Sequence, residues 1–361
     1  MTNLKLDKWI ISSTLLLMII GLVIVASSSI AIADSSYHKP LYFLMRQSIF
    51  LVLALSVALT TLFIPIEFYF KKHNIILWAC FLLLIAVLIP GIGQSVNGSR
   101  RWINLGFMSL QVSEGVKLGM IIFLARELTL IKNIKINEVK NLGKTIILLL
   151  LASILLLIEP DFGATCVICA SALGMLFISG VRLRWFILMI TFMIASMSAL
   201  VIFSPYRFAR LTGFLDPWAH KYTAGYQLTQ SLIAFGRGGI FGVGLGNSIQ
   251  KLFYLPEAHT DFVLAIAAEE LGLIGVLVIL GLYAILIFRG LKIANRNLTN
   301  NYKFHGYLAY GLTFWLALQM LINVGVNIGL LPTKGLTLPF TTSKKCWHSF
   351  FSGSDCMISM Q

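Results

Sequence analysis

The chain of 361 residues is 58% hydrophobic and only 12% charged, and its mean hydropathy is +0.87. A soluble domain of this composition would lack the polar residues needed to cover its surface, so that class is excluded. A formal net charge of +14 would suit nucleic-acid binding, but the positive residues lie between long apolar runs, which indicates membrane topology instead. The sequence therefore predicts an all-α polytopic membrane protein.

Nine apolar runs approach the length of about 20 residues that crosses a bilayer. We expect spans at 9–33, 43–64, 74–91, 108–131, 144–158, 162–180, 185–203, 261–288 and 305–331. The first ends like a signal-peptidase site, but its apolar run is longer than a signal sequence has, so we expect it to be retained. One long loop, 204–260, separates spans seven and eight.

The positions of Lys and Arg predict which face each loop occupies. With a cytoplasmic N-terminus, most basic residues of the short loops fall on the cytoplasmic side. The outer side then carries its basic residues mainly in loop 204–260, and long loops weigh little in this rule. We therefore expect a cytoplasmic N-terminus, with the long loop and Asp261 on the outer face.

Two polar groups follow the third span. Arg100 and Arg101, beside Trp102, suit an anionic headgroup because guanidinium groups bind phosphate oxygens; interface anchoring is the alternative. Glu114 and Lys117 share one helix face within the fourth span, where ionisable residues are costly. They indicate either a functional cavity or a purely structural ion pair.

A third group, Glu159-Pro160-Asp161-Phe162-Gly163, separates spans five and six. The simplest interpretation is a turn made by Pro and Gly, with Asp161 capping the sixth span.

The fourth group, Glu257, His259 and Asp261, lies where a polar loop enters the eighth span. A carboxylate there is partly desolvated, so its proton affinity can be tuned. With His259 and Lys251 close in sequence, Asp261 suits a general base that acts on an anionic lipid. The alternative is that Thr260 or Asp261 caps the helix.

Two further patterns carry no site. The glycine-rich run 236–246 follows no strand and contains no Gly-Lys-Ser/Thr, so we expect no nucleotide there. Cys166 and Cys169 lie inside an apolar helix without neighbouring ligands, so we expect them to pack and assign no metal ligand.

These groups resemble motifs of the SEDS family (shape, elongation, division and sporulation proteins) in order and spacing. The resemblance extends over roughly 10–340 and rests on the four groups above together with 226–236, 244–248 and 268–272. Residues 247–251 and 257–259 favour the cell-division branch of the family over its elongation branch.

The resemblance implies a ten-helix peptidoglycan glycosyltransferase that polymerises lipid II on the outer face of the cytoplasmic (inner) membrane. Asp261 matches the family's essential aspartate, which implies a general base for the 4-hydroxyl of the acceptor sugar. The departing undecaprenyl diphosphate needs positive charge, and we expect Arg100, Arg101 and Lys117 to supply it, ahead of Lys251. Glu114, Glu257 and His259 complete the expected substrate site. A divalent cation would help the diphosphate leave, although no ligand set for one is readable, and no other cofactor is identified.

The resemblance also implies partners and a place in the cell. We expect a class B penicillin-binding transpeptidase (FtsI) and other division proteins at the septum. Two rival functions stay open: a lipid II flippase, and a scaffold or inactive remnant.

The chain departs from the resemblance after Phe340. The family continues with a Ser-Tyr-Gly-Gly-Ser-like run and a tenth helix, whereas 341–361 is polar and has no run that could span a bilayer. We therefore divide the chain into a transmembrane domain, 1–340, and an aberrant tail, 341–361. A shifted reading frame is the expected cause, and a lineage-specific tail is the alternative. We expect nine spans, and a copy that is weak or inactive.

Overall fold

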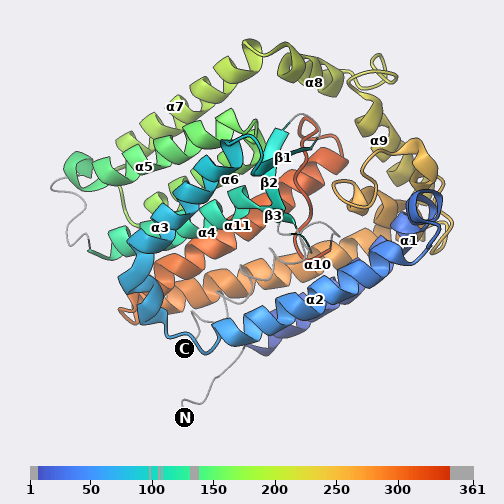
Figure 1. The fold of residues 1–361 in the computed structure, drawn as a ribbon. Helices are drawn as coiled ribbons and strands as arrows, with labels where there is room; N and C mark the ends of the chain where they lie inside the picture. The colour runs from blue at the N-terminus through green and yellow to red at the C-terminus, as the bar shows by residue number, and fades with distance from the viewer. Residues whose placement is uncertain (1–6, 97–98, 105, 107–108, 131–137, 342–361) are drawn as a thin grey trace.

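The computed structural model describes residues 7–96, 99–104, 106, 109–130 and 138–341. Each predicted span coincides with a helix, and these helices pack into one bundle (Figure 1). They are α1 (Lys8–Tyr37), α2 (Tyr42–Thr61), α3 (Ile66–Leu88), α4 (Val112–Leu130), α5 (Glu138–Ile158), α6 (Phe162–Ile178), α7 (Leu183–Ile202), α10 (Val263–Thr299) and α11 (Lys303–Asn327). Of the predicted tail, 342–361 lies outside the described residues.

Six of these helices are by themselves long and apolar enough to cross a membrane, within the part of the chain that the structure describes. They are α1, α2, α3, α7, α10 and α11. Helices α5 and α6 contribute shorter apolar stretches, and α4 carries four charged residues. The chain is a membrane protein, and the number of nine spans stays a prediction.

Several helix ends differ from the prediction because charge marks where a helix leaves an apolar layer, not where the helix stops. Helix α3 begins at Ile66, not at 74, and so includes Lys71 and Lys72. Helix α10 continues beyond 288 to Thr299. The apolar run alone therefore underestimates both helices.

A small antiparallel sheet follows α3, which the all-helical prediction missed. Its strands β1 (Gly93–Val96), β2 (Ser99–Asn104) and β3 (Ser109–Gln111) pair in chain order. The fourth span accordingly starts at Val112 and not at 108. Strand β2 is central, since its Trp102 lies opposite Gln94 on one side and Gln111 on the other.

The predicted long loop, 204–260, contains helices of its own. These are α8 (Pro205–Leu215), α9 (Tyr226–Gly238) and a π-helical turn, η1 (Gln250–Tyr254). The buried Glu269 carboxylate of α10 holds the segment: it accepts hydrogen bonds from Arg237 (3.0 Å), the Ser248 hydroxyl and the Ile249 amide (3.1 Å). The loop is thus packed against the bundle.

Helices α10 and α11 run side by side through the bundle, with α1 and α2 along one flank and α3 to α7 along the other (Figure 1). At one end of the bundle, Arg101 contacts the 159–161 turn and Arg210 contacts Thr333. At the opposite end, Arg289 pairs with Asp7. The β-sheet, the 159–163 turn, the long loop and Asp261 therefore gather at the same end.

Candidate functional site

The turn before α10 is folded back on itself and presents Asp261. The Glu257 carbonyl accepts hydrogen bonds from the amides of Thr260 and Asp261, both at 3.1 Å, and Glu257 adopts a positive φ of 55°. The Thr260 hydroxyl donates to the Glu257 carboxylate at 2.5 Å. The cap residue of α10 is Phe262, which makes no side-chain cap bond. The alternative that Thr260 or Asp261 caps this helix is therefore wrong.

A row of buried polar side chains on α11 fixes the main chain of this turn. Asn323 and Asn327 donate to the Asp261 carbonyl at 2.9 and 3.2 Å. Asn323 also donates to the Leu336 carbonyl at 2.7 Å, so one amide joins the Asp261 turn to the segment after α11. Sequence reasoning missed this row, although polar residues four apart in an apolar helix are a readable signal.

The Asp261 carboxylate lies against Gly335, in the segment that follows α11. A Cβ added at Gly335 would lie 3.0 Å from Asp261 Oδ2. Glycine therefore leaves room beside one oxygen of the half-buried carboxylate. The His259 ring lies beside Phe43 on α2, with the two ring centroids 5.2 Å apart.

Glu114 and Lys117 form the ion pair that their spacing predicts. Their charged atoms are 2.5 Å apart, and each side chain is only 1% exposed. The Lys117 ammonium also lies 5.1 Å from the Trp315 ring, which donates to Gln319 on α11. Gln319 in turn bonds the Thr337 carbonyl at 3.2 Å, so the pair and Asp261 contact the same helix.

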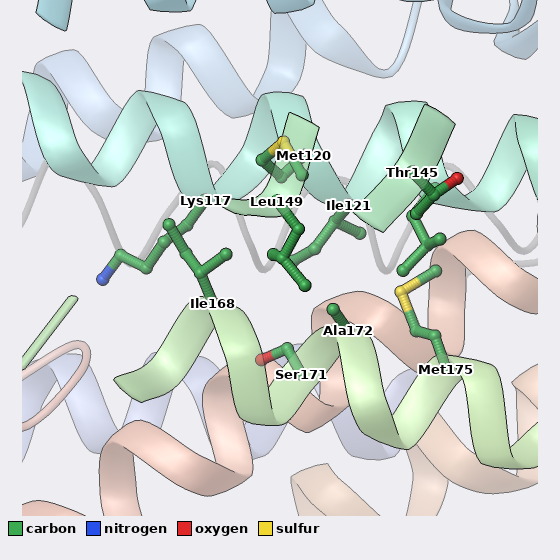
Figure 2. Close-up of a pocket in the computed structure, with 10 residues that line it drawn as sticks. Lys117, Met120, Ile121, Thr145, Leu149, Ile168, Ser171, Ala172 and Met175 are labelled. Carbon is green, nitrogen blue, oxygen red and sulfur yellow. The ribbon is translucent and has the colours of Figure 1, made fainter. Parts of the chain in front are cut away.

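A cavity of about 10 Å³ lies beside this pair, between α4, α5 and α6 (Figure 2). Its walls are mostly apolar, and in Figure 2 the Lys117 ammonium points away from Ser171 and Met175. Such a volume holds one water molecule at most. This cavity is therefore no site for a lipid headgroup.

Lys251 is held away from Asp261 by a buried cluster. Its ammonium contacts Glu270 Oε1 at 2.7 Å and Ser27 Oγ at 2.9 Å, and the Ser27 hydroxyl donates to the same carboxylate. This arrangement joins α1, η1 and α10 and already neutralises the Lys251 charge.

The two adjacent arginines of β2 lie in different surroundings. Arg101 donates to the carbonyls of Glu159 (3.4 Å) and Pro160 and lies 3.7 Å from Asp161 Oδ1. Arg100 is exposed. Asp161 caps α6 by accepting from the Ala164 amide at 3.2 Å, as the turn interpretation predicts. The first and third groups of the sequence thus form one cluster.

Glu159, in this turn, is completely buried, and its carboxylate has no hydrogen-bond partner among the described residues. Burial, together with the nearby Asp161, raises the pKa of Glu159 to about 8, against an opposing effect of Arg101. The group therefore favours the protonated form in the folded protein.

This burial predicts a pH-dependent stability. Because the folded-state pKa lies above the ordinary value of 4.5, the contribution of Glu159 is complete below 4.5 and is lost as the pH rises through about 8. The free energy of unfolding should fall by up to about 1.4 kcal/mol per pH unit in this window. Thermal unfolding in detergent across the window should show the slope. Glu159→Gln should flatten it and the exposed-site control Glu67→Gln should not; an unchanged slope in Glu159→Gln would disprove the assignment.

Comparison with known proteins identifies the family. A family model described as "Cell cycle protein", which groups FtsW, RodA and SpoVE, matches residues 7–343. The chain belongs to the SEDS family. The probable peptidoglycan glycosyltransferase FtsW of Legionella pneumophila is 53% identical to this SEDS protein over 92% of this chain and 84% of its own length. The protein of the same name from Coxiella burnetii is 52% identical over 92% of this chain and 90% of its own length.

Solved structures show the same fold. One chain, from a peptidoglycan synthase complex that coordinates polymerization and crosslinking, has a TM-score of 0.78 and 26% identity, and the match covers 98% of this chain and 97% of that one. The rod shape determining protein RodA of Thermus thermophilus has a TM-score of 0.71 and 26% identity, over 99% of this chain and 96% of its own. The resemblance to the SEDS family is confirmed.

Proposed function

We propose that this SEDS protein is a peptidoglycan glycosyltransferase that polymerises lipid II into glycan strands during cell division. The observation that carries the proposal is the setting of Asp261. Its main chain is fixed by Asn323 and Asn327, while its carboxylate lies beside Gly335 at the end of the bundle where the polar motifs gather. The FtsW relatives, which are named for this activity, support the reaction type.

The chemistry is one displacement at the anomeric carbon of the donor. Asp261 takes the proton of the acceptor's 4-hydroxyl, and that oxygen forms a bond to the carbon. The bond to the donor's diphosphate breaks, and its electron pair leaves with undecaprenyl diphosphate. A single displacement inverts the configuration, so an α-linked donor gives a β-linkage. The rigid hold on the turn matters because a general base must lie within hydrogen-bond reach of the proton that it removes.

The same proposal places the protein in the cell. The distribution of basic residues supports a cytoplasmic N-terminus and an outer-facing Asp261, in the inner membrane and at the septum. A class B penicillin-binding transpeptidase such as FtsI is the proposed partner. The similar chain from a synthase complex that combines polymerization and crosslinking supports such a pairing.

Lipid II given to the purified protein tests the proposal, with and without the transpeptidase. A polymerase produces glycan strands in detergent, where no second compartment exists. A flippase moves labelled lipid II across a liposome bilayer and makes no strands, and a scaffold does neither. Strand formation by the complex is the expected result; lipid II translocation without strands would contradict it.

A substitution at Gly335 would displace the Asp261 carboxylate without removing it. A Cβ there would lie 3.0 Å from Asp261 Oδ2, so Gly335→Ala should displace the carboxylate. We expect strand synthesis to slow by at least about 10-fold, because small misplacements of a catalytic group are costly. Gly236→Ala is the matched control, since a Cβ at Gly236 meets nothing within 4 Å. Equal rates for the two variants would show that Asp261 does not need this space.

A further inference from the structure

Two cationic side chains, one from α8 and one from the segment after α11, lie over the ring of Phe162, the first residue of α6, and a third cation, also from α8, contacts the same segment. The Lys334 ammonium lies 3.4 Å from the centre of the Phe162 ring, and the Arg207 guanidinium lies 5.5 Å from the same centre. Arg210 donates to the Thr333 carbonyl at 3.0 Å, next to Lys334 in the chain. The three residues, here called the basic cluster, are all half-buried.

No carboxylate of the described chain pairs with any member of the basic cluster. The nearby Asp161 is engaged by Arg101, Gln111 and the Ala164 amide. Burial lowers the pKa of Lys334; the Cys166 thiol opposes this shift, and Arg207 and Arg210 add to it. The three positive charges repel one another in a partly desolvated place, which destabilises their charged forms. An anion bound there would offset this repulsion.

The segment that contributes Lys334 to the basic cluster also contacts the proposed base. Lys334 directly precedes Gly335, the residue that lies against Asp261 Oδ2. On its other side the same segment packs onto α6, where a Cβ at Gly163 would lie 3.1 Å from Leu336. The segment that carries Lys334 therefore contacts both the start of α6 and the Asp261 carboxylate.

The cations that the sequence predicted at the substrate's diphosphate are less able to bind an anion. Lys117 is paired with Glu114, Lys251 with Glu270, and Arg101 with the 159–161 turn. Freeing any of them would leave a buried carboxylate or buried carbonyl groups without a partner. Arg207 and Arg210 each donate to a single carbonyl, of Leu200 and Thr333, and no member of the basic cluster is paired with a carboxylate of the described chain.

We propose that Arg207, Arg210 and Lys334 bind the diphosphate of the lipid-linked substrate. The inference rests on the proposed function and deepens it by assigning the group that receives the departing charge. As the donor's anomeric carbon–oxygen bond breaks, the electron pair passes to the diphosphate, and the three cations stabilise the added negative charge. The acceptor oxygen forms the new bond, and its proton goes to Asp261.

Binding of undecaprenyl diphosphate to the Asp261→Asn protein, in which turnover is expected to be very slow, tests the site without requiring catalysis. Arg207→Gln, Arg210→Gln and Lys334→Met should each raise the dissociation constant by roughly 10- to 100-fold, as expected for loss of one charged hydrogen bond. Lys334→Arg should retain most of the affinity. Lys221→Gln, an exposed site in the same outer loop, is the matched control and should bind normally.

Anionic lipid is the other source of phosphate at a membrane surface. Vesicles of phosphatidylglycerol should compete weakly, and equally with the unsubstituted and substituted proteins. If the substitutions changed only vesicle binding, the site would be one for bulk lipid and the proposal would be overturned. Unchanged affinity for undecaprenyl diphosphate in Arg207→Gln and Arg210→Gln proteins with normal unfolding temperatures would also overturn it, even if Lys334→Met failed to fold.

Different results would reject the diphosphate site and the proposed polymerase activity. Cluster-dependent binding of undecaprenyl diphosphate without strand synthesis would support the site and reject the polymerase. Strand synthesis that persists at a normal rate in the cluster variants would reject the site and leave the polymerase standing.

Discussion

Asp261→Asn should abolish glycan-strand synthesis while the protein still inserts into membranes and unfolds at its usual temperature. Loss of a general base typically slows a reaction by about 10²- to 10⁴-fold. The fold should survive because Asn323 and Asn327 hold the carbonyl of Asp261, which the substitution leaves in place. Strand length on gels and unfolding in detergent measure the two properties.

The control for this variant is Asp216→Asn, which makes the same chemical change in the segment 204–260 that precedes Asp261. Asp216 is exposed at the end of α8, where it accepts from the Ala219 amide. It should retain strand synthesis. Near-normal synthesis by the Asp261→Asn protein would remove Asp261 from the role of base.

Lys117→Met should destabilise the protein by roughly 3–5 kcal/mol, because it leaves the Glu114 carboxylate buried without its ion-pair partner. Both side chains are only 1% exposed, so solvent cannot replace the lost charge. The double variant Glu114→Gln/Lys117→Met removes both charges and should recover much of this stability. Denaturant unfolding of the single and double variants measures the difference.

Another ion pair in the described chain provides the comparison. Lys144 lies 3.7 Å from Glu127, and its side chain is 56% exposed. Lys144→Met should therefore cost less than about 1 kcal/mol. If the Glu114/Lys117 double variant were no more stable than Lys117→Met alone, the two buried charges would not stabilise each other.

The helices of the bundle could be predicted from the sequence because each of them contains a continuous run of apolar residues. The pair Glu114–Lys117 could also be predicted, since its spacing places both residues on one helix face. The β-sheet could not, because its short strands are polar and depend on pairing between residues 93–111. Helices α8 and α9 were missed within a segment whose apolar content is too low to mark a span.

The site was predictable in part. Asp261 stands out because an acid precedes an apolar helix, but its neighbours come from distant segments. The contact with Gly335 joins residues on opposite sides of α10 and α11, and the contact of Arg101 with Pro160 joins β2 to the start of α6. From the sequence Lys251 was expected to contact the substrate, because its ion-pair partner, Glu270, lies 19 residues further along the chain. Long-range pairing of this kind leaves no local pattern.

The pH dependence of a single glycosyl transfer tests the central claim most directly. With protein in excess over lipid II, even slow formation of the first linkage can be timed in the unsubstituted and Asp261→Asn proteins. The account predicts that the unsubstituted rate rises with pH as one group loses its proton, and that Asp261→Asn leaves a slow rate without this rise. The same rise in the Asp261→Asn protein would show that another group is the base.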